Sequence, residues 1–265
     1  MAYPRPLRVS RGWSLLLAAV LVLAGCAGSQ QASETTREIT LKATASQTRI
    51  TDALAEDPQV EELVAPYRET MQATMGEPLA VSPQPMETDH PEGLLGALIA
   101  DFVLERARAE SRERVDACVI NNGGLRIPWP KGVITLRLVY EVMPFDNEIV
   151  LLRLDADQMR ALAAEIGARR GEPISGFGFA ISGSEVVDVQ VGGKPVEARD
   201  YWVATSDYLA GGGGGMSTLW EPREIRRTGV LVRDAIADAL RGHGQVGGGE
   251  LGEIPLPAMG RIRER

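Results

Sequence analysis

The feature that most constrains this chain is a short apolar run, residues 117–120, that ends abruptly in the sequence N-N-G-G, residues 121–124. Such a run is typical of a buried strand, and glycines directly after a strand let the backbone take positive φ and pass close to a ligand. Arg126 follows and carries a rigid fork of donors that suits a phosphate, a carboxylate or a sugar. We therefore expect a buried strand that ends in a ligand-binding turn, although the same sequence also fits an ordinary turn.

A second candidate site sequence is P-F-D-N, residues 144–147, which places an aromatic ring beside a side-chain amide. The ring of Phe145 offers a flat apolar face, and the amide of Asn147 can donate and accept hydrogen bonds at the edge of a heterocycle. This pair suits a flat heteroaromatic base. A phenylalanine after a proline is also common in a packed core, so the pair alone leaves both interpretations open.

Four motifs in this order, N-N-G-G-L-R, G-V-I-T, Y-E-V-M-P-F-D-N and S-D-Y-L-A-G-G-G-G-G, carry a resemblance to a known family. They resemble the C-terminal domain of the 5′-nucleotidase family, which recognises the nucleoside part of the substrate. The resemblance covers residues 57–240 and implies a nucleoside or nucleotide ligand. The substrate-binding residues that it implies are Asn121, Gly123, Gly124, Arg126, Phe145, Asn147 and Tyr208.

By the same resemblance, Phe145 and Tyr208 hold the base between their rings, Asn147 reaches the base edge, and Arg126 and Asn121 orient the substrate. Stacking on each ring contributes about 1–3 kcal/mol in comparable complexes. The residues themselves also allow plainer roles. The two rings could pack in the core, Arg126 could pair with a surface acid, and Asn121 could simply support its turn.

The chain departs from the family pattern in its glycine-rich segment. Gly211 and Gly214 stand where the family has Asn and Asp, and Met216 replaces an aromatic residue. The family's Asp takes the ribose hydroxyls, and loss of such a charged acceptor typically costs about 1.5–3 kcal/mol. Upstream, residues 89–91 read D-H-P where members often carry an arginine. The resemblance therefore implies a retained base clamp with weakened ribose and phosphate contacts.

The chain offers no basis for a catalytic metal site. Family enzymes hydrolyse the phosphate at two metal ions held by an N-terminal metallophosphatase domain, and such sites need several His, Asp and Asn ligands. Here there are 2 histidines, His90 and His243, and both are expected in exposed turns. We predict no catalytic residue, metal ligand or cofactor in this chain. A divalent metal pair is expected only in a partner metallophosphatase, so whether the chain is itself an enzyme stays open.

The N-terminus has the pattern of an export signal. Three arginines precede a short apolar run, residues 13–23, which is too short to span a bilayer. The following L-A-G-C resembles a bacterial lipobox, with cleavage before Cys26 and lipidation of its thiol; an ordinary secretory signal with an incidental cysteine is the alternative. We expect a protein lipid-anchored to the cell envelope on the periplasmic side, at the outer membrane where the cell has two, because Ala27 follows rather than Asp.

Charge and cysteine content limit the partners. The chain has 28 basic and 36 acidic residues, and because only arginines leave with the leader the net charge of the remainder is about −11. Such an acidic protein is not expected to bind nucleic acid or an anionic membrane surface. Without Cys26, Cys118 is the last thiol, and we expect it to be a small core residue.

Periodicity predicts helices alternating with short strands, hence a single α/β (α+β) domain with a mixed β-sheet flanked by helices. The predicted boundaries are a signal peptide at 1–25, a flexible tether at 26–50, the domain at 51–245 and a tail at 246–265 that ends in a frayed basic segment. Predicted helices cover 58–75, capped by Asp57, a segment from 94, a short segment capped by Thr135, a segment from 157, and 230–240. Predicted strands cover 38–43, 79–81, 117–120, 149–154, 178–182, 186–191 and 201–205.

Three functions fit these observations. The first is a split 5′-nucleotidase for nucleotide catabolism, in which this lipoprotein recognises the base and a separately encoded metallophosphatase supplies the metals. The second is a stand-alone nucleoside-binding lipoprotein. The third is a structural module that has kept the fold and lost the pocket, for which Gly214 is the best support.

Overall fold

The computed structural model describes residues 47, 49–51, 54–245 and 250–265. The predicted leader, most of the tether and the strand expected at 38–43 lie outside these residues. The chain divides into two units, Met1–Ala55 and Glu56–Arg265, and the fold described below belongs to the second.

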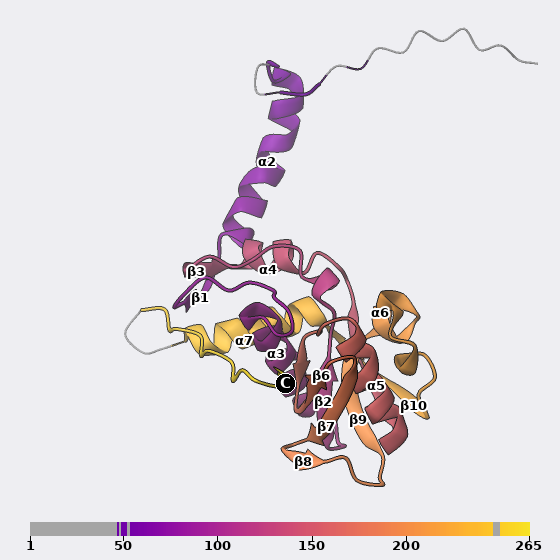
Figure 1. Ribbon diagram of the computed structural model, residues 1–265. Coiled ribbons are helices and arrows are strands. Elements are labelled where there is room, and N and C mark those ends of the chain that lie inside the picture. The colour runs from indigo at the N-terminus through magenta and orange to yellow at the C-terminus, as the bar shows by residue number, and fades with distance from the viewer. Residues whose placement is uncertain (1–46, 48, 52–53, 246–249) are drawn as a thin grey trace, which may run out of the picture. The chain divides into compact units, whose positions relative to one another are not determined.

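The described residues form a five-stranded sheet, a four-stranded sheet and a two-stranded sheet (Figure 1). Only the β2–β9 and β6–β11 pairs are parallel, so the sheets are mixed as predicted. In spatial order the largest sheet contains β10 (Glu224–Leu231), β4 (Glu148–Leu154), β9 (Tyr201–Ser206), β2 (Val115–Val119) and β5 (Ile174–Ser175). The second contains β11 (Ile262–Glu264), β6 (Phe177–Ser182), β7 (Glu185–Val191) and β8 (Lys194–Pro195), and the third pairs β1 (Pro78–Ser82) with β3 (Gly132–Thr135).

Most of the predicted helices are present. The α-helices are α2 (Pro58–Met75), α3 (Leu94–Glu110), α4 (Leu136–Val142), α5 (Ala156–Ala168), α6 (Asp207–Ala210) and α7 (Val232–Gly244), and short 3-10 turns lie at η1 (Asn122–Gly124), η2 (Gly213–Gly215) and η3 (Ser217–Leu219). Asp57 caps α2 as predicted, because its carboxylate accepts the backbone N–H groups of Gln59 and Val60. Thr135 stands at the start of α4 but its side chain makes no capping bond.

The central sheet separates two apolar cores because side chains alternate along its strands. On β4, Ile149 and Leu151 face the core that contains α3 and α7. Val150 and Leu152 face the other core, which contains α5. This arrangement, with helices packed on both faces of a mixed sheet, confirms the predicted fold class (Figure 1).

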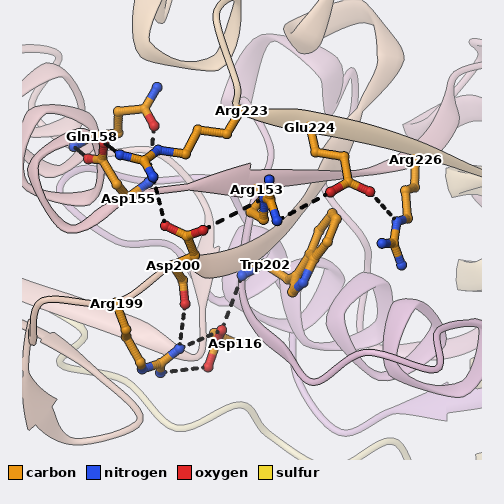
Figure 2. Close-up of polar contacts among 10 residues, drawn as sticks. All are labelled: Asp116, Arg153, Asp155, Gln158, Arg199, Asp200, Trp202, Arg223, Glu224 and Arg226. Carbon is orange, nitrogen blue, oxygen red and sulfur yellow. Dashed lines mark hydrogen bonds and ion pairs between the residues drawn. The ribbon is translucent and has the colours of Figure 1, made fainter.

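Charged side chains form a network of hydrogen bonds and ion pairs at one end of the central sheet (Figure 2). Arg153 of β4 stands in register between Trp202 of β9 and Glu224 of β10, and its guanidinium lies 3.5 Å from the Glu224 carboxylate. Asp116, with a side chain only 2% exposed, accepts two hydrogen bonds from Arg199 (2.8 and 3.2 Å) and one from the backbone N–H of Trp202. This network lies where β2 and β9 begin, so their other ends remain available for a site.

Two sequence predictions about the C-terminal part were wrong. The predicted frayed segment from Arg261 to Arg265 contains β11, which pairs with β6 and buries Ile262. The last helix begins at Val232 rather than Val230, because the preceding residues continue strand β10 along β4. A hairpin turn joins β7 to β8, with positive φ at both Gly192 and Gly193.

Candidate functional site

A cavity of about 240 Å³ opens at the other end of the central sheet. Its lining is made by the seven residues that the sequence singled out for ligand binding: Asn121, Gly123, Gly124, Arg126, Phe145, Asn147 and Tyr208. The structure therefore brings all of the predicted site residues together, although they come from three separate stretches of the chain.

Strand direction explains why these stretches meet. β2 and β9 are parallel neighbours, so Asn121 after β2 and Tyr208 after β9 emerge at the same edge of the sheet. β4 runs antiparallel to β9 with Ile149 opposite Ser206, so the residues just before β4 arrive at that edge as well. Asn147 is fixed there because its carbonyl accepts the backbone N–H of Val232 (2.8 Å). A position outside the carboxyl ends of adjacent parallel strands is a common place for ligand sites.

The N-N-G-G segment forms the floor as a single 3-10 turn. The Gly124 N–H donates to the carbonyl of Asn121 (3.0 Å), and the side-chain amide of Asn121 folds back over the turn. A Cβ atom placed on Gly123 or Gly124 would lie 3.2 Å from that amide. The expectation of positive φ at these glycines was wrong, because both lie outside the left-handed region. At these positions glycine leaves room for the close approach of a side chain and does not serve an unusual backbone conformation.

Arg126 sits at the mouth of the cavity and is exposed. Its backbone N–H donates to the carbonyl of Val142, which joins the turn to the end of α4. Its Nη1 donates to the carbonyl of Gly123 (3.2 Å). Among the described residues no carboxylate forms an ion pair with this guanidinium. The alternative role of Arg126, pairing with a surface acid, is therefore not seen in the structure.

The two rings of the predicted clamp are not core residues. Phe145 is 40% exposed and Tyr208 is 51% exposed, and both line the cavity. Tyr208 lies on α6, whose start is capped by the Ser206 hydroxyl accepting the Leu209 N–H. Its ring rests directly on the backbone of Gly213, because a Cβ placed there would be 2.4 Å from the ring. The core alternative is therefore excluded for both rings.

The glycine-rich segment has backbone conformations that suit glycine. Gly212, Gly214 and Gly215 have φ of 104°, 63° and 70°. At Gly214, where the family pattern places an Asp, a Cβ would come within 2.5 Å of Leu209. A side chain at position 214 would have to displace the end of the Leu209 side chain and take up a backbone conformation that favours glycine.

Arg233 is a supporting residue that the sequence did not reveal. From α7 it reaches Asp146 with Nη2 (2.5 Å) and the carbonyl of Phe145 with Nη1 (3.5 Å), and its guanidinium lies 4.2 Å above the ring of Tyr140. It thus holds the segment that presents Phe145. Because the pair joins residues 87 positions apart, no local sequence signal identifies it.

Two carboxylates lie next to the segments that line the cavity. Glu172 accepts the Asn122 N–H (2.7 Å), and its burial raises the pKa of its carboxyl, opposed by that hydrogen bond and by nearby Arg169 and His90. Glu148, at the start of β4, has a lowered pKa because the Gly229 N–H and the Arg227 guanidinium favour its charged form. Neither carboxylate lines the cavity.

The described residues contain no group of three or more His, Cys, Asp or Glu side chains that could hold a metal ion. His90 lies in an exposed turn as expected. The prediction of an exposed turn at His243 was wrong, because His243 lies inside α7 with its ring 5.7 Å from that of Phe102. Cys118 is fully buried in β2, as predicted, and its burial raises the pKa of its thiol. Within the described part of the chain, no helix combines the length and apolar composition that crossing a bilayer requires.

The lining of the cavity combines hydrogen-bonding groups with flat apolar surfaces. Its polar groups are two amides, a guanidinium and a phenol, and its apolar surface is two ring faces. Its volume is below the range of about 300–1,000 Å³ that is usual for whole ligands. It suits a flat ring system held at its faces and edge, with the rest of the ligand at the mouth beside Arg126.

Comparison with known proteins identifies the family of this chain. A model of the family described as "5′-nucleotidase, C-terminal domain" matches residues 73–221. The trifunctional nucleotide phosphoesterase protein YfkN of Bacillus subtilis is 28% identical over 188 residues, which cover 64% of this chain and 12% of that protein. A 5′-nucleotidase of Vibrio parahaemolyticus is 24% identical over 208 residues, covering 74% of this chain and 36% of that protein.

Solved structures give the same result. The 5′-nucleotidase precursor of Thermus thermophilus superposes with a TM-score of 0.65 at 28% identity, over 79% of this chain and 43% of that one. The NAD nucleotidase of Haemophilus influenzae shares the fold, with a TM-score of 0.57 at 17% identity. The chain spans about a third or less of the curated relatives and under half of the Thermus structure. Since the family model matches more than half of its residues, the chain belongs to the family defined by the 5′-nucleotidase C-terminal domain.

Proposed function

We propose that this chain is the base-recognising half of a 5′-nucleotidase-type hydrolase that acts in nucleotide catabolism. The observation that carries the proposal is that two exposed rings, Phe145 and Tyr208, lie beside amide and guanidinium donors in one cavity. The base stacks between the rings, the Asn147 amide bonds its edge, and Asn121 and Arg126 orient the sugar and phosphate side. Each ring contributes about 1–3 kcal/mol of stacking.

Hydrolysis itself is assigned to a separate metallophosphatase subunit that supplies the divalent metal pair. Support comes from the relatives, which include proteins named 5′-nucleotidases, and from the described residues, which contain no group of three or more His, Cys, Asp or Glu side chains that could hold a metal ion. The residues of this chain then bind and orient the nucleoside, while the phosphate at the mouth meets the metals of the partner. In such a two-metal site the ions stabilise the attacking and leaving oxygens.

A second candidate is a stand-alone nucleoside-binding lipoprotein. It is favoured by one observation: the residues of this chain already supply two exposed rings and amide and guanidinium donors around one cavity. Both candidates place the protein outside the cytoplasm, anchored through Cys26 to the periplasmic side of the envelope. The leader supports export, as does the similarity to a Thermus protein named as a precursor.

The test is isothermal titration of the chain from Ala27 onward, which keeps every described residue, with adenosine and with AMP. Micromolar binding that disappears in Phe145→Ala and persists in Trp220→Ala, an exposed aromatic outside the cavity lining, is the expected result. Hydrolysis of AMP after addition of a metallophosphatase encoded beside this gene then selects the split enzyme over the stand-alone binder. Absence of heat at millimolar ligand, with no hydrolysis after the addition, overturns both candidates.

A further inference from the structure

Helix α2 presents an apolar face that nothing in the described structure covers. None of its residues is buried, and its largest apolar side chains are exposed, with Leu63 at 70% and Tyr67 at 69%. The exposed apolar residues follow the spacing of one helix face: Val60, Leu63, Val64, Tyr67 and Met71. Figure 1 shows that the helix extends away from the sheets.

Only the C-terminal end of α2 is fixed to the body. Met75, on the same face, packs against the core that contains α3 and α7, and the neighbouring turns lie beside α4. An isolated helix of 18 residues is marginally stable in water, and most helices gain their stability from burial of an apolar face. A well-capped helix with a bare apolar face therefore indicates an interaction surface.

We propose that α2 pairs antiparallel with α2 of a second copy of this chain. The apolar face is close to palindromic about Ala65 and Pro66. In an antiparallel pair Val60 of one copy meets Met71 of the other, and Val64 meets Tyr67, so the same contacts form twice. Such an interface, in which each patch is its own complement, is the usual form of a twofold dimer.

Charge complementarity supports this partner and this direction. Glu61 and Arg68 lie seven residues apart on one flank of the apolar face, where they form an ion pair within the helix with one bond of 2.9 Å. Antiparallel pairing brings the same flanks of two helices together, so Glu61 of each copy lies opposite Arg68 of the other. Parallel pairing would set this flank against Leu63 and Thr70, which carry no charge.

The ends of the helices match in the same way. The acidic N-terminal end, with Glu56 and Asp57, lies beside the C-terminal end of the other copy's helix, next to α4 with its exposed Arg137. Antiparallel helices also align their dipoles favourably. An anionic membrane surface does not fit, because α2 itself carries three glutamates against Arg68. This inference does not rest on the proposed function, since no α2 residue lines the cavity.

Sedimentation over a range of concentrations tests the pairing on the chain from Ala27 onward. Wild type is expected to dimerise reversibly. Glu61→Arg and Arg68→Glu should each weaken the dimer about tenfold, because attractive pairs become repulsive, and an equal mixture of the two variants should restore it. Glu62→Arg makes the same charge change on the opposite face and should have no effect. A wild-type chain that stays monomeric at all concentrations overturns the proposal and leaves the face to another protein, such as a metallophosphatase.

Disulfide trapping tests the direction independently. Cys118 is fully buried and the chain from Ala27 onward lacks Cys26, so single introduced cysteines can be followed cleanly. A mixture of Val60→Cys and Met71→Cys should give the mixed disulfide rapidly. Val60→Cys alone should not cross-link, because in the antiparallel pair its two copies stand about 16 Å apart. Rapid cross-linking of Val60→Cys with itself overturns the antiparallel arrangement.

Discussion

Replacement of Gly213 by alanine should disable the base clamp without removing either ring. The new Cβ would lie 2.4 Å from Cζ of Tyr208 and 2.5 and 2.6 Å from its Cε2 and Cε1 atoms. Carbon atoms settle about 3.5–4.0 Å apart, so the ring must move by about 1 Å or more. A binding group displaced by more than about 0.5 Å loses its productive geometry.

The predicted effect is specific to binding. Tyr208 is half exposed and can swing outward, and Gly213 lies outside the left-handed region, so the unfolding free energy should change by less than about 1 kcal/mol. Loss of one stacking surface, about 1–3 kcal/mol, corresponds to a loss of about 5-fold to 150-fold in adenosine affinity. Isothermal titration measures the affinity, and thermal unfolding measures the stability.

Gly242→Ala is the matched control, because a Cβ there meets nothing within 4 Å. It should bind adenosine as wild type does. If Gly213→Ala also binds with wild-type affinity, the Tyr208 ring does not hold the ligand and the clamp is refuted. If Gly213→Ala unfolds at a much lower temperature, the ring instead supports the fold.

Three further results follow from the structure. Because no carboxylate lines the cavity, 2′-deoxyadenosine should bind within about threefold of adenosine by titration, and a loss beyond about tenfold would reveal a ribose acceptor. Arg199→Ala leaves the 2%-exposed Asp116 side chain without its main counter-ion and should lower the unfolding free energy by about 3 kcal/mol, measured by urea unfolding. Asp116→Asn keeps a hydrogen-bond acceptor and should lower the unfolding free energy clearly less. Equal losses in the two variants would contradict this explanation. Burial raises the pKa of Glu172, so ionisation of its carboxyl destabilises the folded state as the pH rises above the ordinary pKa of 4.5. The Glu172→Gln variant should therefore be more stable than wild type at neutral pH but not at acidic pH. Parallel curves of unfolding free energy against pH for the two proteins would refute this assignment.

The site residues were predicted from the family resemblance, and the structure brings them together because most of them lie next to strand ends. The apolar run before Asn121 and the strand before Tyr208 are visible in the sequence, and adjacent strands bring their ends to one edge. The reason for the glycines was not predictable. Sequence suggested unusual backbone angles at Gly123 and Gly124, whereas the structure shows that the Asn121 amide lies only 3.2 Å from the place of a Cβ at either position. That crowding depends on a side-chain orientation which sequence does not specify.

The missed elements are those that depend on distant partners. β10 reads E-I-R-R-T-G-V-L, a charged sequence with little strand character, and it forms a strand because it pairs along β4 at an exposed edge. β11 likewise exists because β6 offers it a free edge. The support of Phe145 by Arg233 has the same origin, because it is created by tertiary packing and has no local pattern.

The last prediction separates the binding site from the pairing surface. Val64→Asp places a charge in the apolar face of α2 and should abolish dimerisation while adenosine affinity stays within about twofold of wild type. Phe145→Ala should do the reverse. Independence is expected because α2 meets the body mainly near α4 and contributes nothing to the cavity lining. If Val64→Asp also lowered adenosine affinity, the effect would have to pass through α4, whose C-terminal end leads to Phe145, and pairing would then regulate the clamp.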